Sequence, residues 1–117
     1  RRAVYHQNAR AARVDLLSDF DCPDPAFAAP KRASTTTPLQ ALTLLNHGFT
    51  LDMARALAGR VQARGEAIDR VSAAFELAFA RQPSASERQA AERLVVEHGL
   101  VALCRALLNS NELVYLD

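Results

Sequence analysis

The sequence has few of the residues that usually build a metal or haem site. Its 117 residues include three histidines and two cysteines, and tryptophan is absent. His6, His47 and His98 each lack a second ligand three or four positions away. Cys22 and Cys104 form neither a Cys-x-x-Cys pair nor a Cys-x-x-Cys-His haem motif. We therefore expect no metal and no cofactor in this segment.

The two cysteines leave one question open. A disulfide between Cys22 and Cys104 would close a long loop and add about 4 kcal/mol of stability in the chain-entropy model. Cys104, however, lies on the apolar side of an expected helix, where a free thiol behaves as a small buried hydrophobe. Because the sequence gives no distance between the two, both alternatives stand.

The sequence also lacks an excess of charge of either sign and has no long apolar run. The chain has 14 basic and 13 acidic residues. No basic stripe is interleaved with aromatics, so we expect no nucleic-acid partner. No stretch approaches the roughly 18 uninterrupted apolar residues that a membrane span needs. No signal peptide is visible either. The chain begins with Arg1 and Arg2 rather than Met, so we expect a C-terminal segment of a longer protein.

Alanine is what the sequence has in abundance. It contains 23 alanines but only 31 residues of the larger apolar types Val, Ile, Leu, Met and Phe. Alanine has the highest helix propensity, and small side chains let helices approach closely. We therefore predict an all-α fold with a thin, closely packed core: about five short helices in one domain over residues 1–117. Pro23, Pro25 and Pro30 predict a long loop in its N-terminal part.

Helix boundaries follow from local signals. Thr37-Pro38-Leu39-Gln40 and Ser84-Ala85-Ser86-Glu87 both predict capping boxes at helix starts. Asn46-His47-Gly48 predicts a helix end, with Gly48 left-handed, His47 as a C-terminal partner and Thr50 or a neighbour capping the next helix. Further helices are expected from about Val14 to Asp21, from about Glu66 to Arg81, from Ser84 to His98 and from Val101 to Leu108, with Gly99 between the last two.

One cluster has the chemistry of an anion site. It consists of Lys31, Arg32, Ser34, Thr35 and Thr36, followed by the free amides of a helix start. Bases, hydroxyls and helix amides together suit a phosphate, a sulfate or a carboxylate. The alternative is structural, because hydroxyl side chains also cap helices and form turns, and we favour it.

A catalytic centre is not indicated. The hydroxyls at positions 34 to 37 have no His or Asp placed locally to activate them. Asp19, Asp21 and Asp24 lack the ligand spacing of a calcium loop, so turn formation and helix termination explain them better. We expect no catalytic activity from this segment alone.

Four stretches carry a family resemblance: RRAVY, FDCPDP, RASTTTPLQALTLLNHGF and LLNSNELVYLD. Their order and spacing resemble the C-terminal part of the planctomycete secreted domain, a family of unknown function. The family's polar signature falls on Arg1, Arg2, Tyr5, Asp21, Asp24, Arg32, Ser34, Thr35, Pro38, Gln40, Asn46, Asn109, Asn111 and Glu112. Ala3, Cys22 and Leu113 depart from the family's usual residues.

The resemblance implies a context. Proteins of this family are large exported multidomain chains, often with a cytochrome-c-like haem region elsewhere, and are associated with polysaccharide utilisation. It thus implies a secreted or periplasmic scaffold or interaction domain whose partners are the remaining domains of the parent chain. The alternative is part of an active site, or an anion or sulfated-glycan site, completed by the N-terminal portion of the parent. Within the segment, we expect Asn109 or Asn111 to bond the residues around Tyr5 and tie the termini together.

Overall fold

The protein is helical throughout the part that the structure describes. A computed structural model of the chain describes residues 15–24, 28, 30–31, 35, 37–64 and 69–114, and these contain seven helices and no strand. The all-α prediction is confirmed. The chain divides into two compact units, Arg1–Leu44 and Leu45–Asp117. A single domain over residues 1–117 stays a prediction.

The first unit contains helix α1 (Asp15–Asp19) and most of helix α2 (Pro38–Asn46). The predicted capping box opens α2. Thr37 Oγ1 accepts the Gln40 amide at 3.3 Å, and Gln40 Oε1 accepts the Thr37 amide at 3.1 Å. Two of the amides that lack a helical partner are thereby satisfied, as the sequence predicts.

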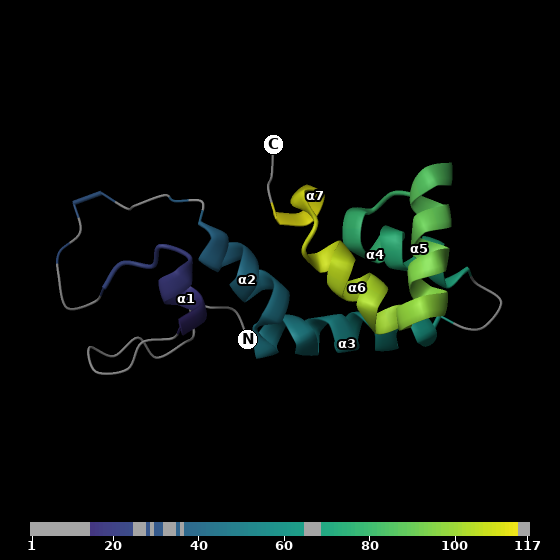
Figure 1. Cartoon of the computed structure of the whole chain (residues 1–117), viewed down its shortest axis with the longest axis horizontal. Coiled ribbons are helices and arrows are strands. Elements are labelled where there is room, and N and C mark those ends of the chain that lie inside the picture. Colours follow the sequence, from purple (N-terminus) through teal and green to yellow (C-terminus); the bar gives the residue numbers. More distant parts are fainter. Residues whose placement is uncertain are drawn as a thin grey trace. The chain divides into compact units, whose positions relative to one another are not determined.

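The second unit contains α3 (Gly48–Gln62), α4 (Arg70–Phe79), α5 (Ala85–His98), α6 (Leu100–Leu108) and α7 (Asn111–Val114). Helix α6 packs along α3, α5 packs on α4 and α6, and α7 lies against α4 and α6 (Figure 1). Five helices, α2 to α6, have nine residues or more, against about five predicted. Helix α1, with five residues, corresponds to the helix predicted from about Val14 to Asp21, and the four-residue α7 was not predicted.

The core of the second unit is built largely from small side chains. Its twelve buried apolar residues, within the described part, are Ala54, Ala58, Val61, Val71, Ala73, Ala74, Phe75, Ala91, Leu100, Leu103, Cys104 and Leu107. Five are alanines, so the backbones of neighbouring helices approach closely. The thin core that composition predicts is confirmed. Both cysteines are free thiols, and burial raises the pKa of Cys104 to about 11.

The junction between α2 and α3 differs from the prediction. His47 is the N-cap of α3, not a C-terminal partner of α2: its backbone is extended, and its Nδ1 accepts the Phe49 amide at 3.1 Å. Gly48 is the first residue of α3 and has no left-handed backbone. Thr50 is buried inside the helix and caps nothing. The side chain of His47 thus caps α3 without a left-handed glycine. The single extended residue His47 is enough to separate the two helices.

Helix α4 also ends earlier than predicted, at Phe79 instead of Arg81. Ala80 takes the left-handed conformation, with φ 56° and ψ 25°, which costs an alanine about 1 kcal/mol. The turn frees Arg81 to leave the helix. At the other end Asp69 caps α4, while the expected start near Glu66 lies outside the described residues. The capping box of α5 and the end of that helix at Gly99 (φ 86°) are as predicted.

Candidate functional site

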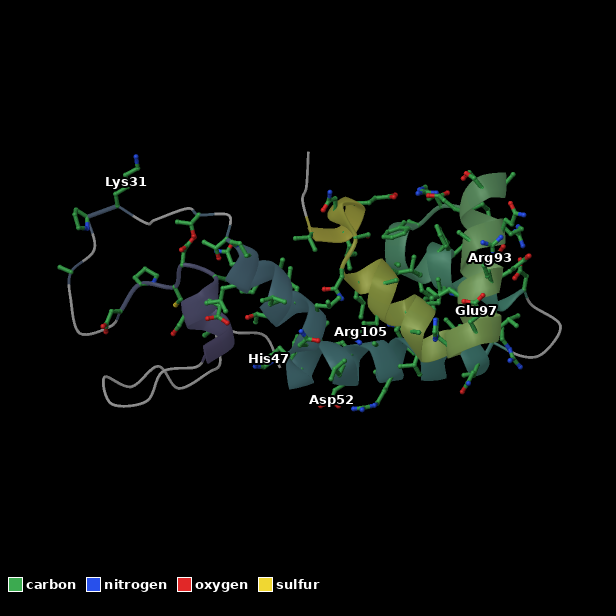
Figure 2. All side chains as sticks on the ribbon, in the orientation of Figure 1. Lys31, His47, Asp52, Arg93, Glu97 and Arg105 are labelled. Atoms are coloured by element: carbon green, nitrogen blue, oxygen red, sulfur yellow. The ribbon has the colours of Figure 1, made fainter. Side chains whose placement is uncertain are left out.

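The predicted anion cluster is described at two of its five positions. Lys31 is exposed and extends away from the ribbon (Figure 2). The amide of Thr35 donates to Asp21 Oδ2 at 2.6 Å, and its hydroxyl donates to the same carboxylate at 2.9 Å. Arg32, Ser34 and Thr36 lie outside the described residues. The donors of Thr35 thus already bind a carboxylate from within the chain.

Two further contacts complete this polar arrangement in the first unit. Thr35 Oγ1 accepts a hydrogen bond from Gln40 Nε2 at 3.1 Å, and Thr43 Oγ1 donates to Asp19 Oδ2 at 2.5 Å. The amide of Gln40, at the helix start next to the cluster, is taken by the predicted cap. Asp21 itself has a left-handed backbone, with φ 56°. These contacts explain Asp19 and Asp21 as structural residues, while the anion site stays a prediction.

Arg105 joins two stretches of the resemblance that are far apart in sequence. Its Nε donates to the Leu45 carbonyl at 2.9 Å, and its Nη2 donates to Asn46 Oδ1 at 3.0 Å. Its own carbonyl accepts from Asn109 Nδ2 at 2.7 Å. Figure 2 shows Arg105 on α6 above the α2–α3 junction, where His47 is labelled. Since the last carbonyls of a helix lack intrahelical partners, the guanidinium is a cap for the end of α2.

The predicted network between the Asn-rich stretch and Tyr5 falls on residues outside the described part. That network stays a prediction; the amide nitrogen of Asn109 donates to the Arg105 carbonyl of α6. Its Oδ1 is buried and, among the described residues, has no hydrogen-bond partner. The turn after α6 is closed by Ser110, whose hydroxyl donates to the Leu107 carbonyl at 2.8 Å.

A second arginine, Arg81, has a partner for every donor. Nε and Nη2 donate to the two oxygens of Glu112 at 2.7 Å each. Nη2 and Nη1 donate to Glu87 at 2.7 and 3.0 Å, and Nη1 also donates to the Gln82 carbonyl at 3.1 Å. A guanidinium has five N–H groups, so all five are used. This Arg81 network connects the end of α4, the start of α5 and α7.

The surroundings of Arg81 fix its charge. Its guanidinium carbon lies 5.6 Å from the Phe75 ring centre and 5.5 Å from that of Phe79, within cation–π range. Hydrogen bonds from Glu112 and Glu87 raise the pKa of Arg81. The hydrogen bond from Arg81, followed by the cap bonds of Ser84, lowers the pKa of Glu87 to about 2. Arg81 likewise lowers the pKa of Glu112. Both carboxylates are ionised near neutral pH, which suits an ion pair and not proton transfer.

Neither arginine role was visible in the sequence. Arg81 was expected only as the end of its helix, and Arg105 carried no signal. Each arginine acts on residues at least 25 positions away, namely Glu112 or the Leu45–Asn46 pair. The polar family signature at Asn46 and Glu112 was the available clue, because it marked the acceptors but not the donor.

An apolar stripe on α3 runs from solvent into the core. Phe49, Met53, Leu57 and Val61 recur every four residues, a spacing that drifts around the helix by about 40° at each step. Phe49 and Met53 are 51% and 40% exposed, Leu57 is half-buried and Val61 is 1% exposed. Leu45, at the end of α2, is 42% exposed. We call Leu45, Phe49 and Met53 the apolar surface of the second unit.

The second unit also has a shallow apolar hollow of about 220 Å³. It is lined by Phe75, Glu87, Ala90, Ala91, Leu94 and Leu103. In the described ranges, no group of three or more His, Cys, Asp or Glu residues is placed to hold a metal ion. None of the helices in those ranges is long and apolar enough to cross a membrane.

Comparison with known proteins gives a family but no activity. A family model described as PSD1, protein of unknown function (DUF1553), matches residues 1–95. No match was found among curated proteins or among solved structures. The match covers most of the chain and bears out the expected domain of unknown function, while the planctomycete origin and the cytochrome-c-like region stay predictions. The chain belongs to the PSD1 family of proteins of unknown function.

Proposed function

We propose that this chain is a helical interaction domain that binds another polypeptide through the apolar surface of Leu45, Phe49 and Met53. The observation that carries the proposal is the exposure of Phe49 and Met53, on a side of α3 next to the buried side formed by Thr50, Ala54, Ala58 and Val61. Large apolar side chains gathered on one exposed patch mark contact sites. The rest of the second unit serves as the scaffold that presents this patch.

The chemistry of the patch favours an apolar protein segment. Leu45, Phe49 and Met53 offer aliphatic, aromatic and thioether groups, and Met adapts its shape to a partner. The nearest charges on α3, Asp52 and Arg55, neutralise each other at 2.8 Å. A neutral apolar surface has little to hold a sulfated glycan. We therefore assign the surface to an amphipathic helix from another domain of the parent protein.

The paired charges support a scaffold and not an enzyme. Glu87 and Glu112, whose pKa values are lowered, are both held by Arg81. Arg105 in turn is used to cap α2. These groups stabilise the helices that carry the surface, and their protonation states do not suit acid–base catalysis.

The biological setting is part of the proposal and rests on the family resemblance alone. It places the domain in a secreted or periplasmic multidomain protein that takes part in polysaccharide utilisation. Haem, where the parent has it, belongs to another region.

The test compares the same substitution in two contexts. In the isolated chain, Phe49→Ser removes a half-exposed ring and should change the opening free energy of α3 amides little. In the full-length parent, where the other half of the ring is covered, the loss should be larger by about 1 kcal/mol. Hydrogen exchange of α3 measures both values.

The control is Val96→Ser, because Val96 is 86% exposed on α5 and lies outside the surface. It should give the same small effect in both contexts. Equal effects of Phe49→Ser in the isolated chain and in the parent would contradict the proposal.

A further inference from the structure

Helix α7 is too short to be stable alone. It has four residues, none of them buried. Its Leu113 and Val114 amides both donate to the Ser110 carbonyl at 3.1 Å, so it amounts to one turn. Isolated helices of this length do not form in water because nucleation is unfavourable. The position of α7 therefore depends on contacts with the rest of the second unit.

The charged contact that holds α7 is the two-point pair of Glu112 with Arg81. Both oxygens of Glu112 accept, one from Nε and one from Nη2. The two side chains are 44% and 38% exposed. An exposed ion pair of good geometry shifts the equilibrium between closed and open α7 by a small factor, roughly two- to fivefold. A contact of this strength closes α7 but lets it open.

Arg81 keeps its place without α7. Glu87, fixed in the capping box of α5, binds Nη1 and Nη2, and the Gln82 carbonyl binds Nη1. Phe75 and Phe79 lie beside the guanidinium. If Glu112 departs, Nε and one hydrogen of Nη2 lose their acceptor while the others keep theirs. What remains is a fork of two parallel donors, the geometry that binds a carboxylate at two points.

We propose that α7 is a latch on a carboxylate-binding site: Glu112 fills the site in the closed chain, and an acidic side chain of a second polypeptide fills it when α7 opens. The ligand class follows from the occupant, since the site already holds a glutamate. This inference does not rest on the apolar surface of Leu45, Phe49 and Met53, which lies on other helices. It gives a function to the Asn-Ser-Asn-Glu stretch that the scaffold role leaves unexplained.

The test uses the full chain with Glu112→Gln, which removes the charge and keeps the size of the side chain. The variant should raise the amide exchange rates of residues 111–114 about two- to fivefold. Amides of α4 and α5 should keep their rates. Glu97→Gln is the matched control and should change nothing, because Glu97 is exposed on α5 and, among the described residues, has no arginine or lysine partner.

The second arm adds a blocked pentapeptide, Ser-Asn-Glu-Leu-Val, and follows the Nε–H signal of Arg81 by NMR. The peptide should shift the signal at lower concentration in the Glu112→Gln chain than in the wild type. The same peptide with Gln in place of Glu should bind neither. Arg81→Lys in the Glu112→Gln chain keeps the charge but loses the fork. Because this variant has no Arg81 signal, binding is followed on the backbone amides of residues 81–87 in all chains, and it should be abolished in this one.

Three results would overturn the proposal. They are unchanged exchange at residues 111–114 in Glu112→Gln, equal peptide affinity in wild type and variant, and equal binding of the Glu and Gln peptides. A general loss of protection across α4 and α5 would also contradict it, because Glu112 would then be part of the fold and not a latch.

Discussion

The two units of this chain differ in the contacts that stabilise each of them internally. In the second unit twelve apolar side chains are buried among α3 to α6. In the described part of the first unit, the buried side chains are those of Gln40 and Thr43, both polar. Hydrogen bonds of Asp19, Asp21 and Thr35 connect parts of it that are distant in sequence. Among the described residues, burial, which is non-directional, is thus prominent in the second unit, and directed hydrogen bonds are prominent in the first.

This difference bears on the exposed leucines. Leu39 and Leu42 of α2 are 57% and 55% exposed, so the first unit leaves apolar area uncovered while it relies on polar contacts. The apolar surface of the second unit does the same at Phe49 and Met53. Each unit therefore has apolar side chains that a partner could cover, whatever force holds it together.

The largest effect is expected from the apolar core. Leu103 is 3% exposed on α6, and Leu103→Ala leaves a cavity that should lower the free energy of unfolding by about 2–5 kcal/mol. Denaturant unfolding followed by circular dichroism measures it. Val96→Ala, at an exposed position, should stay within about 0.5 kcal/mol. A similar small loss for Leu103→Ala would mean that burial does not hold the second unit.

A smaller and local effect is expected in the first unit. Thr43→Val keeps the shape of the side chain but removes the donor to Asp19, which should cost about 1 kcal/mol. Amide exchange of α2 should quicken while α4 to α6 stay unchanged. Leu42→Ala, on the same helix but exposed, is the control. If α4 to α6 also lost protection, the two units would not be independently stabilised.

Acid should separate the contribution of the Arg81 network from that of the core. The pKa of Glu87 is depressed, to about 2 from an ordinary 4.5. Its contribution is therefore complete above pH 4.5 and is lost as the pH falls towards 2. Denaturant midpoints between pH 7 and pH 2 should fall over this interval, less steeply in Glu87→Gln than in Glu97→Gln. Identical profiles would exclude a stabilising role for the pair.

Almost no effect is expected at the predicted anion cluster. The donors of Thr35 are already bound to Asp21, so sulfated glycans should not shift the melting temperature of the parent protein in a way that depends on Arg32. The comparison is Arg32→Ala against Arg93→Ala, an exposed arginine on α5 (Figure 2). A shift that Arg32→Ala abolishes and Arg93→Ala keeps would establish the anion site instead.

Local signals in the sequence predicted local structure well. The capping boxes at Thr37 and Ser84 and the end of α5 at Gly99 depend on residues within four positions of each other, and all three are found. The prediction of the α2–α3 junction was wrong because it assigned the break to Gly48, whereas His47 caps the next helix through its own side chain. Glycine was the stronger statistical signal, but the histidine ring satisfied the amide.

Tertiary contacts were beyond the sequence for a physical reason. Arg81 contacts Glu112, and Arg105 contacts Leu45, although the partners are far apart in sequence. Only the packing of the helices brings them close in space. The apolar pattern from Phe49 to Val61 likewise predicts a helix but not which of its residues a neighbour covers. The exposure of Phe49 and Met53, which carries the proposed function, therefore needed the structure.

The most direct test of the proposed interaction surface is the reactivity of Met53, the single methionine of the sequence. Its side chain is 40% exposed, so peroxide should oxidise it readily in the isolated chain. If another domain covers the surface, oxidation of Met53 in the full-length parent should be at least several-fold slower, and Phe49→Ser should restore part of the rate. Equal rates in the isolated chain and the parent would show that the surface stays uncovered and would contradict the proposed function.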